Sequence, residues 1–433
     1  MKKGLLGSTA LAGATALMAG TAGAAEAPTW KLTGNANFQL YWVDQDYSAT
    51  MSTGNSPAGW GDVGGAVASN IRPGFNNFRA WDALTDDGDS HPQDHDWYFG
   101  VDEAELQLNV SGAADNGLNY GFKIEINANT TDGTMADEAR LQFSGGWGTV
   151  QMGDEDGAED IMNYGGESLM GASGGFDGDQ DDYTYRNKSG NRAGELRRVY
   201  AYHHTGVGSG LTFDLDSGGG EGGTFDRMNL AAPGWATIAG DTSDQTKVSY
   251  FSPRFSGFQV GASLTPTPNN GDNFKEDGDW ENHIGLGANY DNSFGDLRIR
   301  ASVVYSARTN TEQTWSFFQS RNVDLNEDVS AFSIGGIVGW GPFSLGANYT
   351  DNGDSGQPKV WDEINDITIT APIETSYWNV AAGFETGPMY FSVGYFASTA
   401  EIGFPGIDDS TYDHLALTAD YTVAPGLGVY AEI

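Results

Sequence analysis

The sequence predicts an all-β fold, namely a transmembrane antiparallel β-barrel of about 16 strands, with about 18 as the alternative count. Two observations lead to this fold. Apolar and polar residues alternate along many segments, and short turns alternate with long polar loops between those segments. Alternation is the period of a strand that separates two environments, and connections of unequal length are typical of a barrel that crosses a bilayer.

The first segment with this alternation covers residues 31–42. Its apolar face carries Leu32, Gly34, Ala36, Phe38, Leu40 and Trp42, and the residues between them are polar. About a dozen residues are enough to cross a bilayer at a tilt. The same pattern predicts strands at residues 104–110, 118–129, 139–143, 258–265, 297–305, 332–340, 343–349, 378–384, 389–395 and 415–421.

Short glycine-containing turns connect many of these segments in pairs. A soluble β-sandwich also has alternating strands, but nothing in that fold requires connections that are short at one end and long at the other. The order of turns and loops therefore favours the membrane barrel. The turns are expected at residues 115–117, 145–148, 252–257, 292–296, 339–342, 386–388 and 424–426.

The first 24 residues are typical of an export signal peptide. Lys2 and Lys3 precede an uncharged segment, residues 4–20, and the small residues 22–24 form a cleavage pattern. We therefore expect the mature protein to be residues 25–433 and to leave the cytoplasm, with a membrane anchor as the alternative. The chain has no Cys, which excludes disulfides and thiolate metal sites.

The chain is strongly acidic, with a formal net charge of −38 at pH 7. Removal of the signal peptide takes away Lys2 and Lys3 and brings the charge to −40. Such an excess of carboxylate repels phosphate and attracts cations, so nucleic acid is excluded as a partner. The same acidity is also typical of a solvated surface in a protein from a saline habitat.

Motifs for enzymatic or metal chemistry are weak in this sequence. The histidines stand in no metalloenzyme motif, and residues 206–210 lack the strand-turn-helix context of a phosphate loop. Asp177, Asp179 and Asp181 have the spacing of a calcium loop, but Lys188 stands where such a loop needs Glu. We expect no enzyme activity and no cofactor, with Ca²⁺ at these aspartates as the alternative.

Two segments carry a resemblance to a known family. Residues 247–262 (KVSYFSPRFSGFQVGA) resemble the strand-turn-strand hairpin of general bacterial porins, and residues 148–153 (GTVQMG) resemble the strand that leads into an acidic loop. The chain is similar to this family over nearly all of its mature length, most of all to the alphaproteobacterial type. The resemblance implies a homotrimer in the outer membrane of a Gram-negative bacterium, in contact with lipid and lipopolysaccharide. Each barrel would hold a water-filled pore for passive diffusion of small hydrophilic solutes and ions.

The resemblance also implies a constriction loop, the third long loop, that folds inward at residues 154–194. Because carboxylates outnumber cations between residues 154 and 182, we expect the pore to prefer cations. The acidic side of the constriction is expected from Asp154, Glu155, Asp156, Glu159, Asp160, Glu167, Asp177 and Asp179. The basic side, on the wall, is expected from Lys123, Arg140, Arg197, Arg198, Arg298 and Arg300.

Two other functions compete with passive diffusion. A substrate-specific uptake channel would use an aromatic track, for which Tyr41, Tyr377 and Tyr390 face inward. A hydrolase embedded in the barrel has less support, because a wide barrel leaves an aqueous lumen instead of a packed plug.

The end of the chain departs from the family pattern, in which the last strand finishes on an aromatic residue. Here the final residue is Ile433. The expected strands up to this point number about 17, whereas bacterial barrels have even counts. We therefore expect the closing C-terminal strand to be missing from the printed sequence, with one miscounted strand as the alternative.

Overall fold

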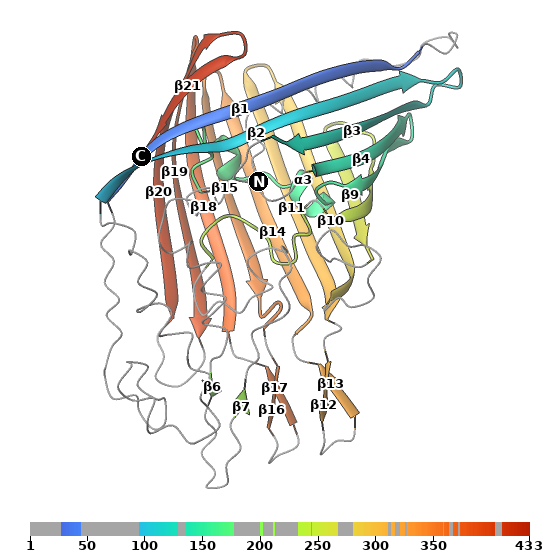
Figure 1. Ribbon diagram of the computed structural model, residues 1–433, viewed down its shortest axis with the longest axis vertical. Helices are drawn as coiled ribbons and strands as arrows, with labels where there is room; N and C mark the ends of the chain where they lie inside the picture. Colours follow the sequence, from blue (N-terminus) through green and yellow to red (C-terminus); the bar gives the residue numbers. More distant parts are fainter. Residues whose placement is uncertain are drawn as a thin grey trace.

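A computed structural model of the chain consists almost wholly of β-strands (Figure 1). Among its described residues, no helix is long and apolar enough to cross a membrane. The structure describes residues 27–44, 95–128, 136–176, 200–201, 211–212, 233–243, 245–266, 280–310, 313–316, 321–324, 327–357, 359–362, 367–370, 373–402 and 409–433.

One large sheet contains 15 strands. Three further pairs of short strands form small hairpins, namely β6 (Tyr200–Ala201) with β7 (Leu211–Thr212), β12 (Gln313–Ser316) with β13 (Arg321–Asp324), and β16 (Lys359–Asp362) with β17 (Ile367–Thr370). The strands of the large sheet are β1 (Thr29–Asp44), β2 (His95–Ala113), β3 (Asn119–Asn127), β4 (Ala136–Gly145), β5 (Gly148–Asp154), β8 (Thr246–Phe251), β9 (Phe258–Thr265), β10 (Trp280–Phe294), β11 (Leu297–Asn310), β14 (Val329–Trp340), β15 (Phe343–Gly353), β18 (Ile373–Thr386), β19 (Met389–Ile402), β20 (Ser410–Ala424) and β21 (Leu427–Glu432).

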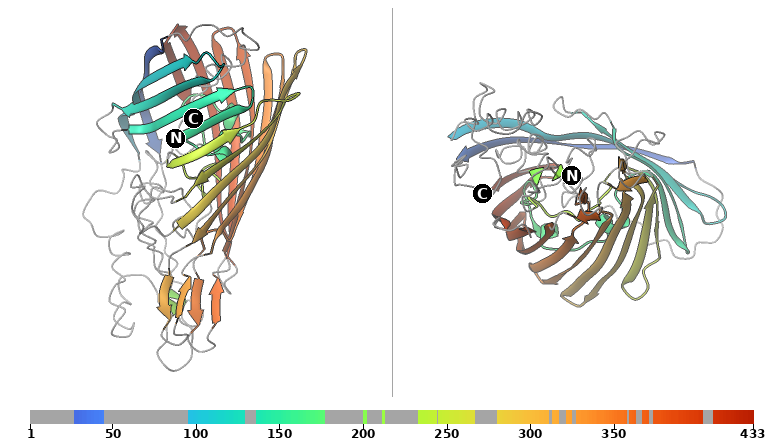
Figure 2. Two further views of the ribbon diagram at one scale, coloured as in Figure 1. Left: turned by 90° about the vertical axis from the view of Figure 1, so that its right-hand side faces the viewer. Right: turned by 90° about the horizontal axis from the view of Figure 1, so that it is seen from below.

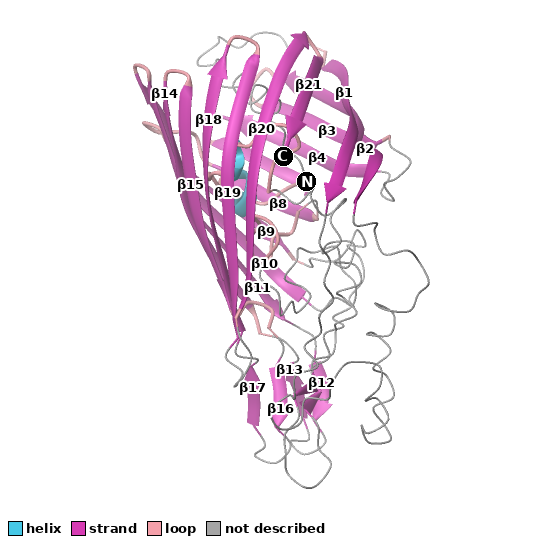
Figure 3. Ribbon diagram, turned by 90° about the vertical axis from the view of Figure 1, so that its left-hand side faces the viewer, coloured by secondary structure: helices cyan, strands magenta, loops and turns pink. Residues whose placement is uncertain are grey.

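The strands of the large sheet follow one another in chain order, and every neighbouring pair is antiparallel. The sheet curls round as a barrel wall (Figure 2), so that β21 returns towards β1 (Figure 3). Within the described residues no ladder joins these two strands. The predicted antiparallel barrel is confirmed, and the 15 strands of its sheet agree with the expected count of about 16.

The two faces of the sheet have opposite chemistry. In β14, Val329 and Ser333 are buried on the inner face, whereas Phe332 and Ile334 are exposed on the outer face. The exposed side chains are apolar, with Leu32 69% and Trp340 72% exposed. A soluble protein would cover such residues, so the outer face suits lipid. The inner face is largely polar and buried, as shown by Ser263, Ser302, Ser306, Asn348, Thr350, Asn379 and Thr418.

Short turns close the hairpins at one end of the barrel, the upper end in Figure 1. In the β10–β11 turn, Phe294 pairs with Leu297 around a two-residue loop whose first residue, Gly295, has φ 67°. In the β14–β15 turn, Gly341 has φ 55° between Trp340 and Phe343. A positive φ at this position is strained for other residues, which explains the glycines in the predicted turns.

One segment leaves the wall and lies inside it. This inner loop, defined here as residues 155–176, follows β5 and contains two short helical turns, α3 (Ala158–Ile161) and η2 (Glu167–Leu169). Both turns lie within the curve of the sheet when the barrel is viewed from below (Figure 2). The inward fold is the one implied by the family resemblance, although only part of the predicted loop, residues 154–194, is described. The predicted signal peptide, residues 1–24, lies outside the described residues.

Candidate functional site

The backbone of the inner loop is attached to side chains of the inner wall. Six loop amide groups donate hydrogen bonds to acceptors on β9, β11, β18, β19, β20 and β21. Because a buried or partly buried donor without a partner costs free energy, these bonds fix the path of the loop. The bonds join Ala158 N to Ser263 Oγ (3.1 Å), Tyr164 N to Ser302 Oγ (2.8 Å), Gly166 N to Asn379 Oδ1 (2.8 Å), Gly171 N to Ser392 Oγ (3.0 Å), Ala172 N to Asp420 Oδ1 (3.0 Å) and Ser173 N to Glu432 Oε2 (3.1 Å).

Apolar side chains of the loop add two packed clusters to these polar attachments. Near α3, Met162 packs with Ala158 and with Val304 of β11. Further along, Phe176 stacks on Phe396 of β19, with 5.8 Å between ring centroids. All five side chains are almost completely buried, so the loop is packed against the wall as a core element and does not project freely into the lumen.

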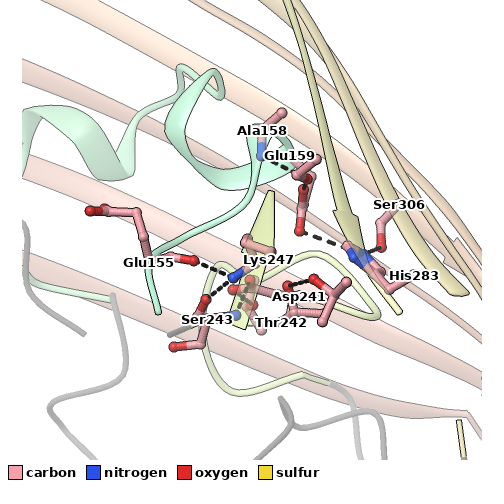
Figure 4. A network of polar contacts seen from close by, with 12 residues as sticks. Glu155, Ala158, Glu159, Asp241, Thr242, Ser243, Lys247, His283 and Ser306 are labelled. Atoms are coloured by element: carbon pink, nitrogen blue, oxygen red, sulfur yellow. Dashed lines mark hydrogen bonds and ion pairs between the residues drawn. The ribbon is translucent and has the colours of Figure 1, made fainter. Parts of the chain in front are cut away.

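A buried polar network surrounds the carboxyl group of Glu159 (Figure 4). Ser263 Oγ donates to Glu159 Oε2 at 2.9 Å, and Nε2 of His283 lies 3.5 Å from Glu159 Oε1. Burial raises the pKa of Glu159. Burial also raises the pKa of Asp241, and the nearby carboxylates of Asp156 and Glu159 raise it further. Burial in the loop attachment therefore disfavours the ionised form of both acids.

The contacts of His283 bear on the hydrolase alternative. Nε2 of His283 lies 3.1 Å from Ser306 Oγ, and the same nitrogen faces Glu159. In a serine hydrolase, the acid and the serine meet opposite nitrogens of the histidine ring. All three side chains are fully buried, out of reach of a substrate. The group therefore has the geometry of a structural network and not of a catalytic triad.

A second charged cluster, the acidic wall, covers the inner faces of β2, β3 and β4 and the start of the inner loop. Lys123 forms ion pairs with Glu125 and with Glu138, the latter at 2.7 Å, and Arg140 pairs with Glu155. Gln107 Nε2 donates to Glu105 Oε2 at 3.1 Å. Within the described residues, carboxylates thus exceed cations in this cluster. Its carboxylates are Glu105, Glu125, Glu138, Glu155 and Asp156, and its cations are Lys123 and Arg140.

Three members of the acidic wall also have the spacing of metal ligands. Carboxylate oxygens of Glu138, Glu155 and Asp156 lie within 4.8 Å of one another. Oxygen donors of this kind suit Ca²⁺ or Mg²⁺. The ammonium group of Lys123 and the guanidinium group of Arg140 already neutralise two of the three carboxylates. The site that the sequence suggested for Ca²⁺, at Asp177, Asp179 and Asp181, lies outside the described residues.

Positive charge gathers near the turn end of the inner wall. Nε and Nη2 of Arg298 donate to the two oxygens of Asp291 at 2.9 and 2.7 Å. The guanidinium carbon of Arg300 lies 5.4 Å from the ring centroid of Tyr164 in the inner loop. Nη2 of Arg254, in the β8–β9 turn, is 3.4 Å from the hydroxyl of Tyr164. This group is distinct from Lys123 and Arg140, which belong to the acidic wall.

The predicted acidic residues of the loop do not form one exposed row. Asp154 accepts a hydrogen bond from Thr246, and Asp160 is exposed. Glu155, Asp156 and Glu159 are buried. The carboxyl group of Glu167 lies beside Asn379, and burial raises its pKa. The predicted residues Asp177, Asp179, Arg197 and Arg198 lie outside the described residues.

The sequence interpretation omitted several charged residues that the fold brings to the site. Glu105 belongs to the polar face of the predicted strand at residues 104–110, and Glu138 directly precedes the predicted segment at residues 139–143. Following the alternation, and extending it by one residue for Glu138, was the signal that could have identified them. Lys247 carries the same signal, because Lys247 and Ser249 alternate with Val248 and Tyr250, whereas Asp241 carries none. Nζ of Lys247 donates to the backbone oxygens of Glu155 and Ser243, and the contact with Glu155 spans 92 residues of sequence.

The barrel is antiparallel, with an apolar exterior and a polar interior, and a loop is fixed along its inner wall. These features define the class of transmembrane β-barrels with a narrowed lumen. The model of one family, the Gram-negative porins, matches residues 8–433. The chain therefore belongs to the Gram-negative porin family, whose members lie in the outer membrane.

Among curated proteins, an uncharacterized protein of Rickettsia prowazekii is 22% identical over 235 residues, which are 44% of this chain and 50% of that protein. One of Rickettsia conorii is 24% identical over 228 residues, 43% of this chain and 49% of that protein. The chain thus spans about half the length of the curated relatives that it matches.

Among solved structures, the same fold is found at low identity. An anion-selective porin from Comamonas acidovorans is 15% identical, with a TM-score of 0.50 over 94% of this chain and 88% of that one. A loop-deletion mutant of OmpT, an outer membrane protein of Vibrio cholerae, is 14% identical, with a TM-score of 0.47 over 94% and 93% of the two chains.

Proposed function

We propose that this protein is an outer-membrane porin through which small hydrophilic solutes and ions diffuse passively, and that its pore prefers cations. The family and the barrel with its polar inner face support a diffusion channel. The acidic wall carries the proposal of selectivity, because its carboxylates (Glu105, Glu125, Glu138, Glu155, Asp156) exceed its cations (Lys123, Arg140).

The electrostatic effect of this excess can be sized from Coulomb's law. A unit charge about 8 Å from a permeating ion in water contributes about 0.5 kcal/mol, before salt screens it over roughly 10 Å at 0.1 M. Each carboxylate of the acidic wall attracts a cation and repels an anion by a similar amount. Removing two of them should therefore change the ratio of cation to anion permeability by about 2 kcal/mol without screening, and screening at 0.1 M salt roughly halves this to a decrease of about fivefold.

The experiment is the reversal potential of the purified channel in a planar bilayer under a KCl gradient. We expect the wild-type potential to lie towards the cation value. The double variant Glu105→Gln/Glu125→Gln should reduce it. Glu401→Gln is the matched control, because Glu401 is exposed on β19, on the face opposite to the buried Ala400. A wild-type potential on the anion side, or equal changes in the two variants, would contradict the proposed selectivity.

Two of the three tyrosines of the alternative aromatic uptake track contact the inner loop. Tyr377 is fully buried in the cluster around Leu169. The hydroxyl of Tyr390 donates to the backbone oxygen of Leu169 at 2.6 Å. Rings that hold the loop are not free to guide a sugar, so these contacts favour general diffusion over a specific track.

We also propose that the protein assembles as a homotrimer and that its outer face contacts outer-membrane lipid and lipopolysaccharide. The wide apolar outer face supports both contacts, because lipid tails or a second subunit would cover it. The expected results are a heat-modifiable oligomer on gels and conductance steps that occur in groups of three. A detergent-solubilised monomer with single independent steps would contradict the trimer.

A further inference from the structure

The chain enters the lumen a second time shortly before β8. This return segment is defined here as residues 233–243, and its last residues, Asp241, Thr242 and Ser243, lie beside the Glu159 network in Figure 4. Three polar contacts attach the segment to buried side chains on the inner faces of β9, β15 and β19. They join Ser398 Oγ to Pro233 O, Ala239 N to Asn352 Oδ1 (2.8 Å) and Thr242 Oγ1 to Thr265 Oγ1 (3.5 Å). The return segment is therefore fixed to the wall, as the inner loop is.

Close packing adds to these polar attachments. Ile238 and Ala239 are buried in the same apolar cluster as Met162 of the inner loop. Gly240 has φ 78°, and a Cβ atom there would lie 2.8 Å from Ser306 Oγ on β11. A side chain does not fit at this point without displacing the wall, so the backbone of the return segment lies directly against the strand.

The return segment lies at a different level of the barrel from the inner loop. On β9, β11 and β19, which both segments contact, the return segment contacts a residue further from the short turn where the strand begins. The contacted residues are, in the order inner loop and return segment, Ser263 and Thr265 on β9, Ser302 and Ser306 on β11, and Ser392 and Ser398 on β19. At about 3.3 Å per residue, these offsets correspond to roughly 7–20 Å along the strands. The two segments therefore form successive levels in the lumen, and they are joined where Ala236 N donates to Phe176 O at 3.2 Å.

Several side chains of the return segment remain half-buried, among them Trp235, Thr237 and Asp241. Ile238 and Ala239, by contrast, are almost completely buried against the wall. Because the backbone lies on the inner face of the barrel, the uncovered parts of the half-buried side chains face the lumen. Thr237 Oγ1 donates to Asp241 Oδ2 at 3.4 Å, which holds these two side chains together. Side chains on the long-loop side of the inner loop are thus held in the path of a solute.

We propose that the return segment forms a second constriction of the pore, and that Trp235 and Thr237 limit the size of the solutes that reach the inner loop. Pore diameter is one of the properties that decide which solutes pass through a channel. A solute meets the two levels one after the other, so the narrower level sets the size limit, and the resistances of both levels to the ionic current add. This inference rests on the proposed pore function, and it assigns the size limit to a segment outside the inner loop.

The test adds bulk at Thr237 after the barrel has folded. The chain has no Cys, so Thr237→Cys places a single thiol in the protein. A methanethiosulfonate reagent that carries a neutral sugar group attaches to this thiol as a disulfide, and a reducing agent removes it again. Conductance of the purified channel is measured in a planar bilayer with polyethylene glycols of graded size, because polymers that enter the pore lower the conductance. We expect labelling to lower the conductance and to shift the size limit to a smaller polymer, and we expect reduction to restore both values.

Thr386→Cys is the matched control, because Thr386 is exposed at the β18–β19 turn and its labelling should leave the conductance and the size limit unchanged. Trp235→Ala is a second variant, which removes the largest half-buried side chain of the return segment and should shift the size limit to a larger polymer.

Complete labelling of Thr237→Cys with an unchanged size limit overturns the second constriction, as does a thiol at this position that the reagent does not reach. An unchanged size limit in Trp235→Ala overturns the role of Trp235. The proposed function fails in a different way. A wild-type protein without conductance refutes the pore itself, whereas a conducting wild type whose size limit does not respond to either change at the return segment refutes only the second constriction.

Discussion

Replacement of Gly166 by Ala tests whether the inner loop is fixed by close contact with β18. Gly166 has φ −65° and ψ −34°, a conformation that Ala adopts readily, so the backbone itself is not strained by the change. Steric contact is the problem. A Cβ atom at Gly166 would lie 2.7 Å from Asn379 Oδ1, 2.8 Å from Ala381 N and 2.9 Å from Val380 C.

The size of the effect follows from these distances. Ordinary contact begins near 3.4 Å, so the loop must retreat from β18 by about 0.7 Å. The hydrogen bond between Gly166 N and Asn379 Oδ1, now 2.8 Å, would then lengthen to about 3.5 Å and be lost. Leaving a buried amide without its partner costs about 1–3 kcal/mol. We expect the loop attachment to weaken by this amount, while the wall keeps its own ladders.

Two measurements report on the loop and on the wall. The temperature at which the folded gel band converts to the unfolded band should fall modestly in Gly166→Ala. Open-channel current noise should rise, because a loosened loop fluctuates inside the pore. Gly146→Ala is the matched control. Gly146 lies in the β4–β5 turn, and a Cβ atom there meets nothing within 4 Å.

The reasoning would be refuted if Gly166→Ala and Gly146→Ala gave the same gel transition and the same current noise as wild type. A fall in the transition temperature of Gly146→Ala equal to that of Gly166→Ala would also refute it. In that case any Ala for Gly would destabilise the barrel, and close contact with Asn379 would not be the cause.

Three further predictions concern the loop. Burial raises the pKa of Glu159 above its ordinary 4.5, so the contribution of this group to stability is greatest below pH 4.5 and is lost as pH rises through the raised pKa. In Glu159→Gln, the gel transition should fall less between pH 4.5 and neutral pH. Asp160→Asn should lower the cation preference in reversal-potential measurements by about twofold, because this carboxylate is exposed. Tyr390→Phe leaves the Leu169 carbonyl without its donor, which costs about 1 kcal/mol and should lower the gel transition.

The strands were predictable because each of them separates lipid from a polar interior. The segment predicted at residues 31–42 is β1, Thr29–Asp44, and the segment at 139–143 is the middle of β4, Ala136–Gly145. The ends of these strands were not predicted, because the hydrogen-bonded pairing of neighbouring strands continues past the alternating residues. The strand β10, Trp280–Phe294, was not predicted, since Gly285 and Gly287 on its inner face weaken the polar signal.

The site was predictable only in part. Position in the sequence identified the inner loop, but it did not indicate which acids would be buried in it. Glu159 lies against Ser263 and His283, more than one hundred residues away along the chain, and these contacts arise only when the barrel forms. The alternation of residues in the sequence indicates which residues lie on opposite faces of a strand. It does not indicate which strands will contact a loop that lies across nine of them.

The six attachments of the inner loop also bear on how such a channel can change during evolution. Every donor is a main-chain amide of the loop, and every acceptor is a side chain of the wall, such as Ser302 or Asn379. A main-chain N–H group is present in all residue types apart from proline. The loop can therefore exchange most of its side chains while it keeps its path. Variation in the loop can alter which solutes pass, and the barrel that carries it does not need a new fold.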